Sequence, residues 1–170
     1  MEGFHVAIVG ATGLVGREFI KILEQRNFPM RSIRLLASDR SAGTKLYVKH
    51  EQVSVEETTA HSFKEVDIAL FSAGAEISSH FSPIAARAGA VVVDNSSAFR
   101  MISTVPLVVP EVNPKDIQNH RGIIANPNCS TIQMVTCLYP LHKVNPIKRI
   151  IVDTYQAVSG TGRAAVEELS

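Results

Sequence analysis

The stretch Gly10-Ala11-Thr12-Gly13-Leu14-Val15-Gly16 decides the fold of this 170-residue chain. It follows an apolar run, Phe4 to Val9, which is typical of a strand buried on both faces. It precedes apolar residues that recur at helical spacing between Val15 and Leu23. A glycine-rich turn between a strand and a helix indicates the first half of a dinucleotide-binding βαβ unit.

Each glycine of this turn has a physical reason in such a unit. Gly10 permits the tight turn, and Gly13 lets backbone N–H groups approach a pyrophosphate at the positive end of the helix. Gly16 allows the helix to pack closely on the strand. A turn whose glycines serve packing alone is the alternative interpretation, but the position at the start of a βαβ chain favours a nucleotide site.

Beyond the turn, short apolar runs continue to alternate with amphipathic stretches, as expected for βαβ units. An interrupted helix is predicted around residues 77–88, kinked or restarted by Pro83 and ended at Gly89. The polar stretch 51–62 has room for a short exposed strand. Further strands are predicted at Ile33–Ala37, Asp67–Phe71, Ala90–Asp94 and Ile123–Ala125. The pattern predicts an α/β, Rossmann-type fold with an open, mostly parallel sheet that binds ligands at the carboxyl ends of its strands.

The pattern changes at Cys129. A helix is predicted from there to about His142, then a long strand at Ile147–Gln156, then a glycine-containing turn and a helix from about Arg163. Residues 1–128 are therefore expected to form a Rossmann-like nucleotide-binding domain, and residues 129–170 the incomplete, truncated start of a second, α+β domain.

Composition excludes several classes of protein. The chain is 45% hydrophobic, and its 17 Lys and Arg residues nearly balance 16 acidic residues. The charges are interspersed, so no nucleic-acid partner and no membrane surface is expected. The longest apolar runs are far shorter than the roughly 20 residues of a membrane helix. No secretory signal is visible at the N-terminus, so a cytoplasmic location is expected.

The two cysteines are expected to be free thiols. Cys129 and Cys137 are eight positions apart in a predicted helix, which separates them by about 12 Å, too far for a disulfide. The six histidines do not fall at metal-ligand spacing with each other or with a cysteine, so no metal site is expected.

The segment Ser38-Asp39-Arg40-Ser41-Ala42-Gly43 follows the second predicted strand, where cofactor choice is set. An acidic residue there favours the ribose hydroxyls of NAD, whereas an arginine accommodates the 2′-phosphate of NADP, and this segment has both. Arg40 between small hydroxyl residues favours NADP without settling the choice. A solvated turn with both charges merely exposed is the alternative.

The segment Asn126-Pro127-Asn128-Cys129-Ser130-Thr131 opens the predicted helix directly after a strand. A helix N-terminus favours the thiolate, so Cys129 is a candidate nucleophile. Asn128 is a candidate helix cap, or a donor to an oxyanion beside the thiol. A small buried hydrophobic residue is the alternative for any cysteine, and it suits Cys137, which lies in the middle of the helix.

Three further features of the sequence have both a functional and a structural interpretation. Arg100 ends the polar loop Asp94-Asn95-Ser96-Ser97-Ala98-Phe99-Arg100, which suits a phosphate or a carboxylate, although an exposed surface arginine is the alternative. The turn that begins at Gln156 and runs to Gly162 is a weak candidate for ligand contact. Tyr139 and Lys143 have the spacing of a catalytic pair of short-chain dehydrogenases, but Pro140 is expected to disrupt the helix that would align them.

Taken together and in this order, the segments resemble the aspartate-semialdehyde dehydrogenase family over nearly the whole chain. The segments that carry the resemblance are Gly10-Ala11-Thr12-Gly13-Leu14-Val15-Gly16, Arg40-Ser41-Ala42-Gly43, Phe71-Ser72-Ala73-Gly74, Asp94-Asn95-Ser96-Ser97-Ala98-Phe99-Arg100, Val108-Val109-Pro110-Glu111-Val112-Asn113, Asn126-Pro127-Asn128-Cys129-Ser130-Thr131 and Gln156-Ala157-Val158-Ser159-Gly160.

The resemblance implies NADPH-dependent reductive dephosphorylation of L-aspartyl 4-phosphate to the semialdehyde, through a cysteine thioester, in lysine, threonine and methionine biosynthesis. By this similarity Cys129 is the nucleophile with Asn128 beside it, Arg100 binds the substrate phosphate, and Gln156 contacts the substrate in the catalytic site. The implied NADP-binding residues are Gly10, Thr12, Gly13, Leu14, Val15, Arg40, Ser41, Ser72, Gly74, Ser159 and Gly160.

The family also has a catalytic histidine and further basic substrate-binding residues beyond position 170, in a larger catalytic domain that forms a homodimer. The 170-residue chain alone is therefore expected to bind NADP(H) and to turn substrate over slowly or not at all. An N-acetyl-glutamyl-phosphate reductase-like enzyme is the nearest enzymatic alternative. A stand-alone nucleotide-binding module without catalysis is the alternative of a different class.

Overall fold

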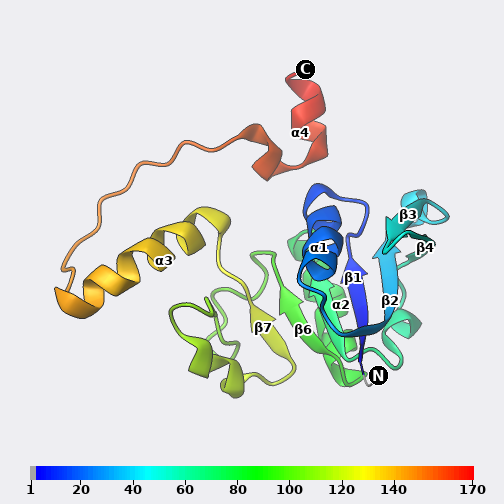
Figure 1. The fold of residues 1–170 in the computed structure, drawn as a ribbon, viewed down its shortest axis with the longest axis horizontal. Coiled ribbons are helices and arrows are strands. Elements are labelled where there is room, and N and C mark those ends of the chain that lie inside the picture. The colour runs from blue at the N-terminus through cyan, green and yellow to red at the C-terminus, as the bar shows by residue number, and fades with distance from the viewer. Residues whose placement is uncertain (1–2) are drawn as a thin grey trace.

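The computed structural model describes residues 3–170, apart from the side chains of residues 163 and 164. A seven-stranded sheet forms its centre (Figure 1). The strands are β1 (Phe4–Val9), β2 (Met30–Ala37), β3 (Lys45–Val48), β4 (Glu51–Glu57), β5 (Ile68–Phe71), β6 (Val91–Asp94) and β7 (Ile123–Ala125). Their order in space is β3-β4-β2-β1-β5-β6-β7, and every neighbouring pair except β3–β4 is parallel. The predicted Rossmann-type, mostly parallel sheet is confirmed.

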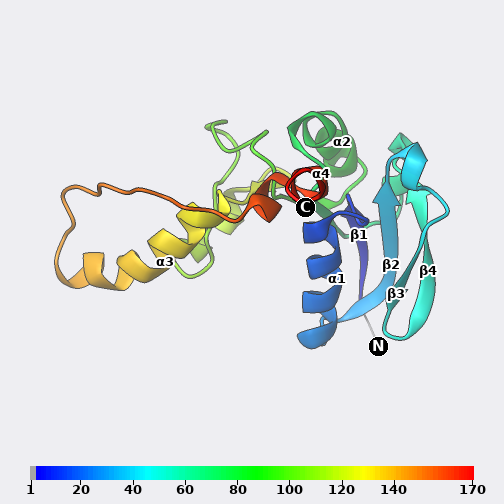
Figure 2. The same ribbon diagram turned by 90° about the horizontal axis from the view of Figure 1, so that it is seen from above.

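Helices α1 (Leu14–Gln25) and α2 (Ala75–Arg87) cover opposite faces of this sheet (Figure 2). Successive residues of β1 show the division, because Ala7 and Val9 join the core cluster under α2 while Ile8 joins the cluster under α1. The chain crosses from β1 to β2 through α1 and from β5 to β6 through α2, in opposite directions along the sheet, so right-handed crossovers place the two helices on opposite faces. The carboxyl end of β1 therefore lies at the point where the strand order reverses.

The glycine turn adopts the close geometry that its sequence predicts. Gly10 has a φ of +87°, and a Cβ there would lie 2.5 Å from the Ser72 carbonyl oxygen. A Cβ at Gly16 would collide with the carbonyl oxygen of Gly10 and lie 2.8 Å from the Ala11 Cα. The first turn of α1 therefore lies so close to the end of β1 that only glycine fits at position 16.

Pro83 does not restart the helix that contains it, and the expected disruption of a helix at Pro140 is wrong. Helix α2 continues through Pro83, and helix α3 (Cys129–Val144) continues through Pro140. Because α3 is unbroken, Lys143 lies over the ring of Tyr139, with its Nζ 4.3 Å from the ring centroid, so the pair does share one face. A proline removes one helical hydrogen bond, and the bonds on either side of it maintain both helices.

The predicted strand at residues 147–156 is also wrong, because this segment is irregular in the structure. A strand needs a neighbour for its backbone groups, and none of the described residues pairs with this segment. Ile151 and Tyr155 are 86% and 99% exposed. Figures 1 and 2 show α3 directed away from the sheet and residues 146–157 arching back to α4 (Arg163–Glu168), so residues 129–170 form an arm that projects from the sheet and its helices.

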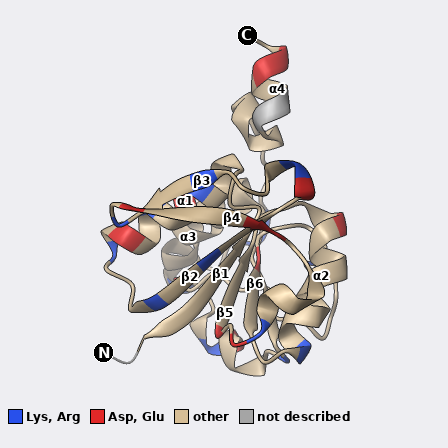
Figure 3. Cartoon of the chain, turned by 90° about the vertical axis from the view of Figure 1, so that its right-hand side faces the viewer, with Lys and Arg blue, Asp and Glu red and all other residues tan. Residues whose placement is uncertain are grey.

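Short 3-10 helices occupy several connections: 39–41, 60–63, 114–119 and 158–161. In the view of Figure 3, the positions of basic and acidic residues are dispersed along the chain rather than gathered in one region. Within the described residues, no helix combines the length and apolar character that crossing a bilayer requires. Over the same residues, no group of three or more His, Cys, Asp and Glu side chains is arranged to hold a metal ion.

Two serines on the buried face of α2 are expected to lower the stability of the protein. Ser78 and Ser82 are fully buried, and neither hydroxyl has a hydrogen-bond partner in the described structure. Replacing Ser78 by alanine is expected to raise the free energy of unfolding by about 1 kcal/mol, because an unsatisfied buried hydroxyl is removed without leaving a large cavity. Urea denaturation measures this change. The exposed neighbour Ser79 is the matched control, since Ser79→Ala changes only helix propensity. Equal gains for the two variants would contradict the burial argument.

Candidate functional site

A cavity of about 550 Å³ lies at the carboxyl ends of β1, β2, β4 and β5, beside the N-terminus of α1. Its position is the reversal point of the strand order, where open α/β sheets bind their ligands. Its lining residues are Gly10, Thr12, Gly13, Ala37, Ser38, Asp39, Arg40, Glu57, Thr58, Ser72, Ala73, Ile77 and Phe81. The cavity therefore has a glycine turn at one end, a charged turn at the other and apolar side chains of α2 along one wall.

The end of the cavity at α1 has the features of a phosphate site. Gly13 is the N-cap of α1 and offers no side chain, so no side-chain hydrogen bond caps the first turn. The first N–H groups of any helix lack partners inside the helix. These donors and the positive end of the helix dipole suit a pyrophosphate that approaches over Gly13.

The other end of the cavity has the turn after β2. Asp39 does not present its whole carboxylate to the cavity, because its Oδ1 accepts a hydrogen bond from the Arg40 backbone N–H at 2.8 Å. The Arg40 side chain is exposed, and its guanidinium has no hydrogen-bond or ion-pair partner in the described part of the chain. A free guanidinium thus faces the position that would discriminate a ribose hydroxyl from a 2′-phosphate.

The structure brings five of the predicted cofactor residues to the cavity wall. They are Gly10, Thr12, Gly13, Arg40 and Ser72. Leu14 and Val15 follow in the exposed first turn of α1, Ser41 follows Arg40 in the same 3-10 turn, and Gly74 is the N-cap of α2. These four lie within two residues of a lining residue in the chain but do not line the cavity.

Four lining residues come from segments that the sequence analysis did not connect with a cofactor. Glu57 is the last residue of β4 and Thr58 follows it, and Ile77 and Phe81 come from α2. Because β4 pairs in parallel with β2, the end of β4 lies at the same sheet edge as the turn after β2. Recognition of β4 as a parallel strand would have placed Glu57 and Thr58 at this edge. Residues 51–62 are mostly polar, so the sequence pattern did not indicate a parallel strand there.

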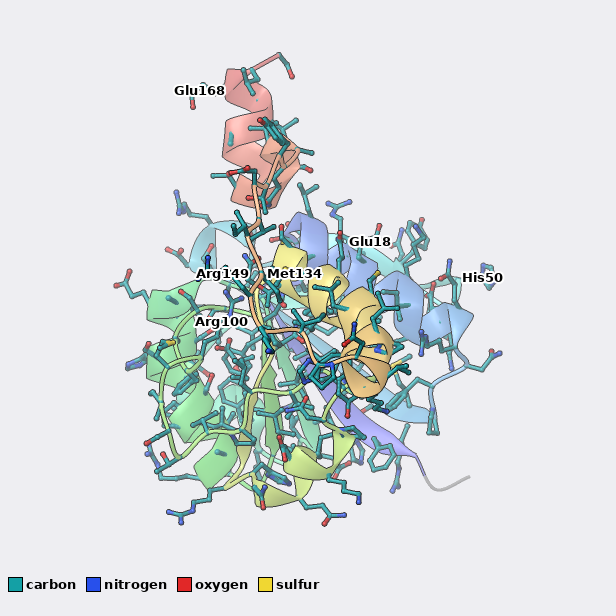
Figure 4. All side chains as sticks on the ribbon, turned by 90° about the vertical axis from the view of Figure 1, so that its left-hand side faces the viewer. Glu18, His50, Arg100, Met134, Arg149 and Glu168 are labelled. Carbon is teal, nitrogen blue, oxygen red and sulfur yellow. The ribbon has the colours of Figure 1, made fainter. Side chains whose placement is uncertain are left out.

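Arg100 lies at the same sheet edge, between the loops that follow β6 and β7. Its Nε donates to the Asn126 carbonyl oxygen at 3.0 Å, and its Nη2 donates to the Asn95 carbonyl oxygen at 3.1 Å. The side chain is half-buried. Figure 4 looks onto this side of the molecule, with Arg100 labelled near the first turns of α3. Arg100 is therefore held by backbone rather than left as a mobile surface arginine.

Cys129 is the first residue of α3 and is exposed. Asn128 caps the helix, because its Oδ1 accepts hydrogen bonds from the backbone N–H groups of Ser130 and Thr131 at 3.0 and 3.3 Å. This capping leaves the amide N–H groups of Asn128 for another acceptor. The thiol thus lies at the N-terminus of a helix whose first turn is capped by the preceding residue. Cys137 is also exposed, so the expectation of a small buried residue there is wrong, because the outer face of α3 is uncovered.

The remaining predicted residues lie on the arm. Gln156 is exposed, and a Cβ at Gly160 would collide with its side-chain amide, so Gln156 and the Ser159-Gly160 turn form one local unit. Within the described residues, no hydrogen bond joins Gln156 to Cys129 or Arg100. The structure therefore does not bring these three residues to the nucleotide cavity or to the thiol.

The strand order, the glycine turn and the cavity define a Rossmann-type dinucleotide-binding domain. Residues 5–120 match the model of the semialdehyde dehydrogenase NAD-binding domain, and residues 138–170 match that of the semialdehyde dehydrogenase dimerisation domain. The chain belongs to this family, and its relatives are aspartate-semialdehyde dehydrogenases, so the resemblance predicted from the ordered segments is confirmed.

Individual relatives show the extent of the match. The aspartate-semialdehyde dehydrogenase of Bacillus subtilis (strain 168) is 56% identical over 168 residues, which cover 99% of this chain and 49% of that protein. The crystal structure of aspartate semialdehyde dehydrogenase II from Vibrio cholerae complexed with ASA is 49% identical, with a TM-score of 0.96 over 99% of this chain and 51% of that one. The enzyme from Candida albicans with NADP is 28% identical, with a TM-score of 0.70 over 86% of this chain and 48% of that one. The chain spans about half the length of the curated relatives it matches.

Proposed function

We propose that this chain provides the nucleotide-binding domain and the nucleophile of an NADP-dependent aspartate-semialdehyde dehydrogenase. The reaction is reductive dephosphorylation of L-aspartyl 4-phosphate to L-aspartate 4-semialdehyde, a step toward lysine, threonine and methionine. One observation carries the proposal: Arg100 is hydrogen-bonded to the carbonyl of Asn126, three residues before Cys129, at the same sheet edge as the nucleotide cavity. An anion-binding guanidinium and a helix-terminal thiol are the two groups that an acyl phosphate needs.

The proposed chemistry follows from these two groups. The Cys129 thiolate attacks the acyl carbon, and the bond from this carbon to the phosphate oxygen breaks, giving a thioester and free phosphate. Arg100 stabilises the charge on the departing phosphate. NADPH held in the cavity would supply the hydride that the thioester carbon accepts. The thiohemiacetal at Cys129 then collapses, which releases the aldehyde and regenerates the thiolate. Asn128, with its free amide N–H groups, is the proposed donor to the substrate oxygen.

The cavity fits a nicotinamide dinucleotide, and we infer that NADP is the preferred form. The uncapped first turn of α1 suits the pyrophosphate, and Arg40 suits a 2′-phosphate. Asp39 is already hydrogen-bonded to its own turn, which favours the phosphate over the ribose hydroxyl at this position. The Candida albicans relative was solved with NADP, which supports the same choice.

Replacing Arg40 by alanine is expected to raise the dissociation constant for NADP by about 10- to 100-fold, because a charge-assisted contact is worth roughly 1.5–3 kcal/mol. NAD binding should change less than about twofold, since NAD has no 2′-phosphate. Titration of both cofactors measures the two constants. Arg31→Ala, at the opposite end of β2, removes the same charge away from the cavity and serves as the control. Equal losses for NADP and NAD would exclude Arg40 from the 2′-phosphate site.

We further propose that residues 1–128 form the NADP-binding domain and that residues 129–170 begin the catalytic and dimerisation domain of a homodimer. The match of residues 138–170 to the dimerisation domain supports this division. The absence of buried residues in α3 also supports it, because the helix presents apolar surface without a covering layer in the described structure.

The test is phosphate-dependent reduction of NADP by the longest native polypeptide that begins with this sequence. Aspartate semialdehyde, N-acetylglutamate semialdehyde and glyceraldehyde 3-phosphate are offered separately. Turnover of the first aldehyde alone is the expected result. Turnover of the second alone would assign the chain to the N-acetyl-glutamyl-phosphate reductase reaction, and binding of NADP without any turnover would favour a nucleotide-binding module.

A further inference from the structure

Two loops at the carboxyl edge of the sheet are joined by their side chains. The Asn126 Nδ2, after β7, donates a hydrogen bond of 2.6 Å to the Asn95 Oδ1, after β6. Both asparagines are half-buried. The backbone reinforces the link, because the Asn126 N–H donates to the Asp94 carbonyl oxygen at 2.8 Å. The two loops are therefore joined by one side-chain and one backbone hydrogen bond.

Arg100 is bound to both members of this pair. Two of its five guanidinium N–H groups donate to the backbone carbonyls of Asn126 and Asn95. The other three have no partner within the described residues. The two carbonyls fix the plane of the guanidinium, and the three free donors can then bind two oxygens of a phosphate.

The loop that carries Arg100 is fixed at its start by hydrogen bonds to a buried carboxylate. Asp94 is fully buried, and its carboxylate accepts hydrogen bonds from the Ser96 N–H at 3.1 Å and the Ser96 Oγ at 2.7 Å. The Ser96 Oγ in turn accepts from the Ala98 N–H at 3.1 Å. These hydrogen bonds fix the backbone at the start of the loop. The orientation of the Arg100 side chain at its end then depends chiefly on the contact with the loop after β7.

We propose that Asn126 is a positioning residue that fixes the Arg100 guanidinium relative to the Cys129 thiol. Its carbonyl oxygen and its side-chain amide both act on the Arg100 loop, and only the buried Pro127 and the capping residue Asn128 separate it from Cys129. The inference rests on the proposed function, since Arg100 and Cys129 act there on one acyl phosphate. Asn126 itself touches neither substrate nor cofactor in this proposal.

A double-mutant cycle on the longest native polypeptide beginning with this sequence tests the proposal. Asn126→Ala is expected to raise the KM for inorganic phosphate by about tenfold, because a displaced guanidinium binds the anion less well. In an Arg100→Lys background, the same substitution should change this KM by less than about twofold, since its effect passes through the guanidinium. The same factor in both backgrounds would show a general structural role and overturn the proposal.

Two further variants keep the test decisive. Asn95→Ala removes the same cross-loop hydrogen bond from the other side, so it should also raise the KM for phosphate about tenfold. This variant replaces Asn126→Ala in the test if Asn126→Ala does not fold. Asn119→Ala changes an exposed asparagine of the 114–119 helix and should leave the KM for phosphate unchanged.

A second readout separates this proposal from the proposed function. Inorganic phosphate should slow iodoacetamide labelling of the Cys129 peptide in the parent protein, and Asn126→Ala should shift the midpoint of this protection to about tenfold higher phosphate. Protection in the parent protein with an unshifted midpoint in the variant overturns the positioning role alone. A parent protein with neither turnover nor protection overturns the proposed function, and the positioning role with it.

Discussion

Cys129→Ser is expected to lower the rate of phosphate-dependent NADP reduction by at least about 10³-fold in the complete native polypeptide. A serine hydroxyl is almost the same size as the thiol, but it is not ionised at neutral pH and is a far weaker nucleophile there. Formation of the acyl-enzyme therefore fails, although the helix N-terminus and its Asn128 cap are preserved. Steady-state assays with aspartate semialdehyde measure the loss.

Cys137→Ser is the matched control, because the two cysteines share one helix and are both exposed. Only Cys129 lies at the helix N-terminus, next to Asn128 and in the segment that contacts Arg100, whereas Cys137 lies in the middle of α3. The Cys137 variant should retain activity within about twofold of the parent protein. Labelling with iodoacetamide at neutral pH gives an independent measure, and the Cys129 peptide should react much faster than the Cys137 peptide. Equal, slow labelling of both would reject Cys129 as the nucleophile.

Sequence predicted the centre of the fold because local signals there agree with the tertiary structure. The apolar strands β1, β5, β6 and β7 and the glycine turn all appear where their patterns placed them. The β3–β4 hairpin was only half predicted. Its two-residue turn is Lys49-His50, whose φ values of +46° and +72° suit a turn usually made by Asn or Gly, so the sequence had no turn signal there.

The site was predictable where it depends on strand ends and helix starts. Arg100 and Cys129 follow adjacent parallel strands, so the topology alone brings their loops together. The hydrogen bond between Asn95 and Asn126 was not predictable, because it depends on the register between β6 and β7 rather than on either segment. The prediction of a strand at 147–156 was wrong for a related reason, since an apolar run forms a strand only beside another strand that pairs with it.

The glycine turn gives a second large expected effect, and its sign is the reverse of the usual one. In an ordinary helix interior, Gly→Ala stabilises by about 1 kcal/mol. Gly16→Ala is instead expected to lower the free energy of unfolding by about 2–4 kcal/mol, because the new methyl group meets backbone that cannot move aside. The atoms it meets are the carbonyl oxygen of Gly10 and the Cα of Ala11, both at the end of the central strand β1.

Gly13→Ala separates this packing effect from ligand binding in the same turn. Gly13 has a φ of −70°, which alanine adopts freely, and its new Cβ would lie 3.2 Å from the Gly10 oxygen, with nothing else within 4 Å. Stability should therefore change by less than about 1 kcal/mol, whereas NADP binding should weaken at least about tenfold because the methyl group occupies the approach of the pyrophosphate. Urea denaturation and NADP titration of both variants measure the two properties. A stable Gly16→Ala protein, or a Gly13→Ala protein that binds NADP normally, would show that the first turn of α1 can retreat from β1, and the close approach would then not be what makes this turn a nucleotide site.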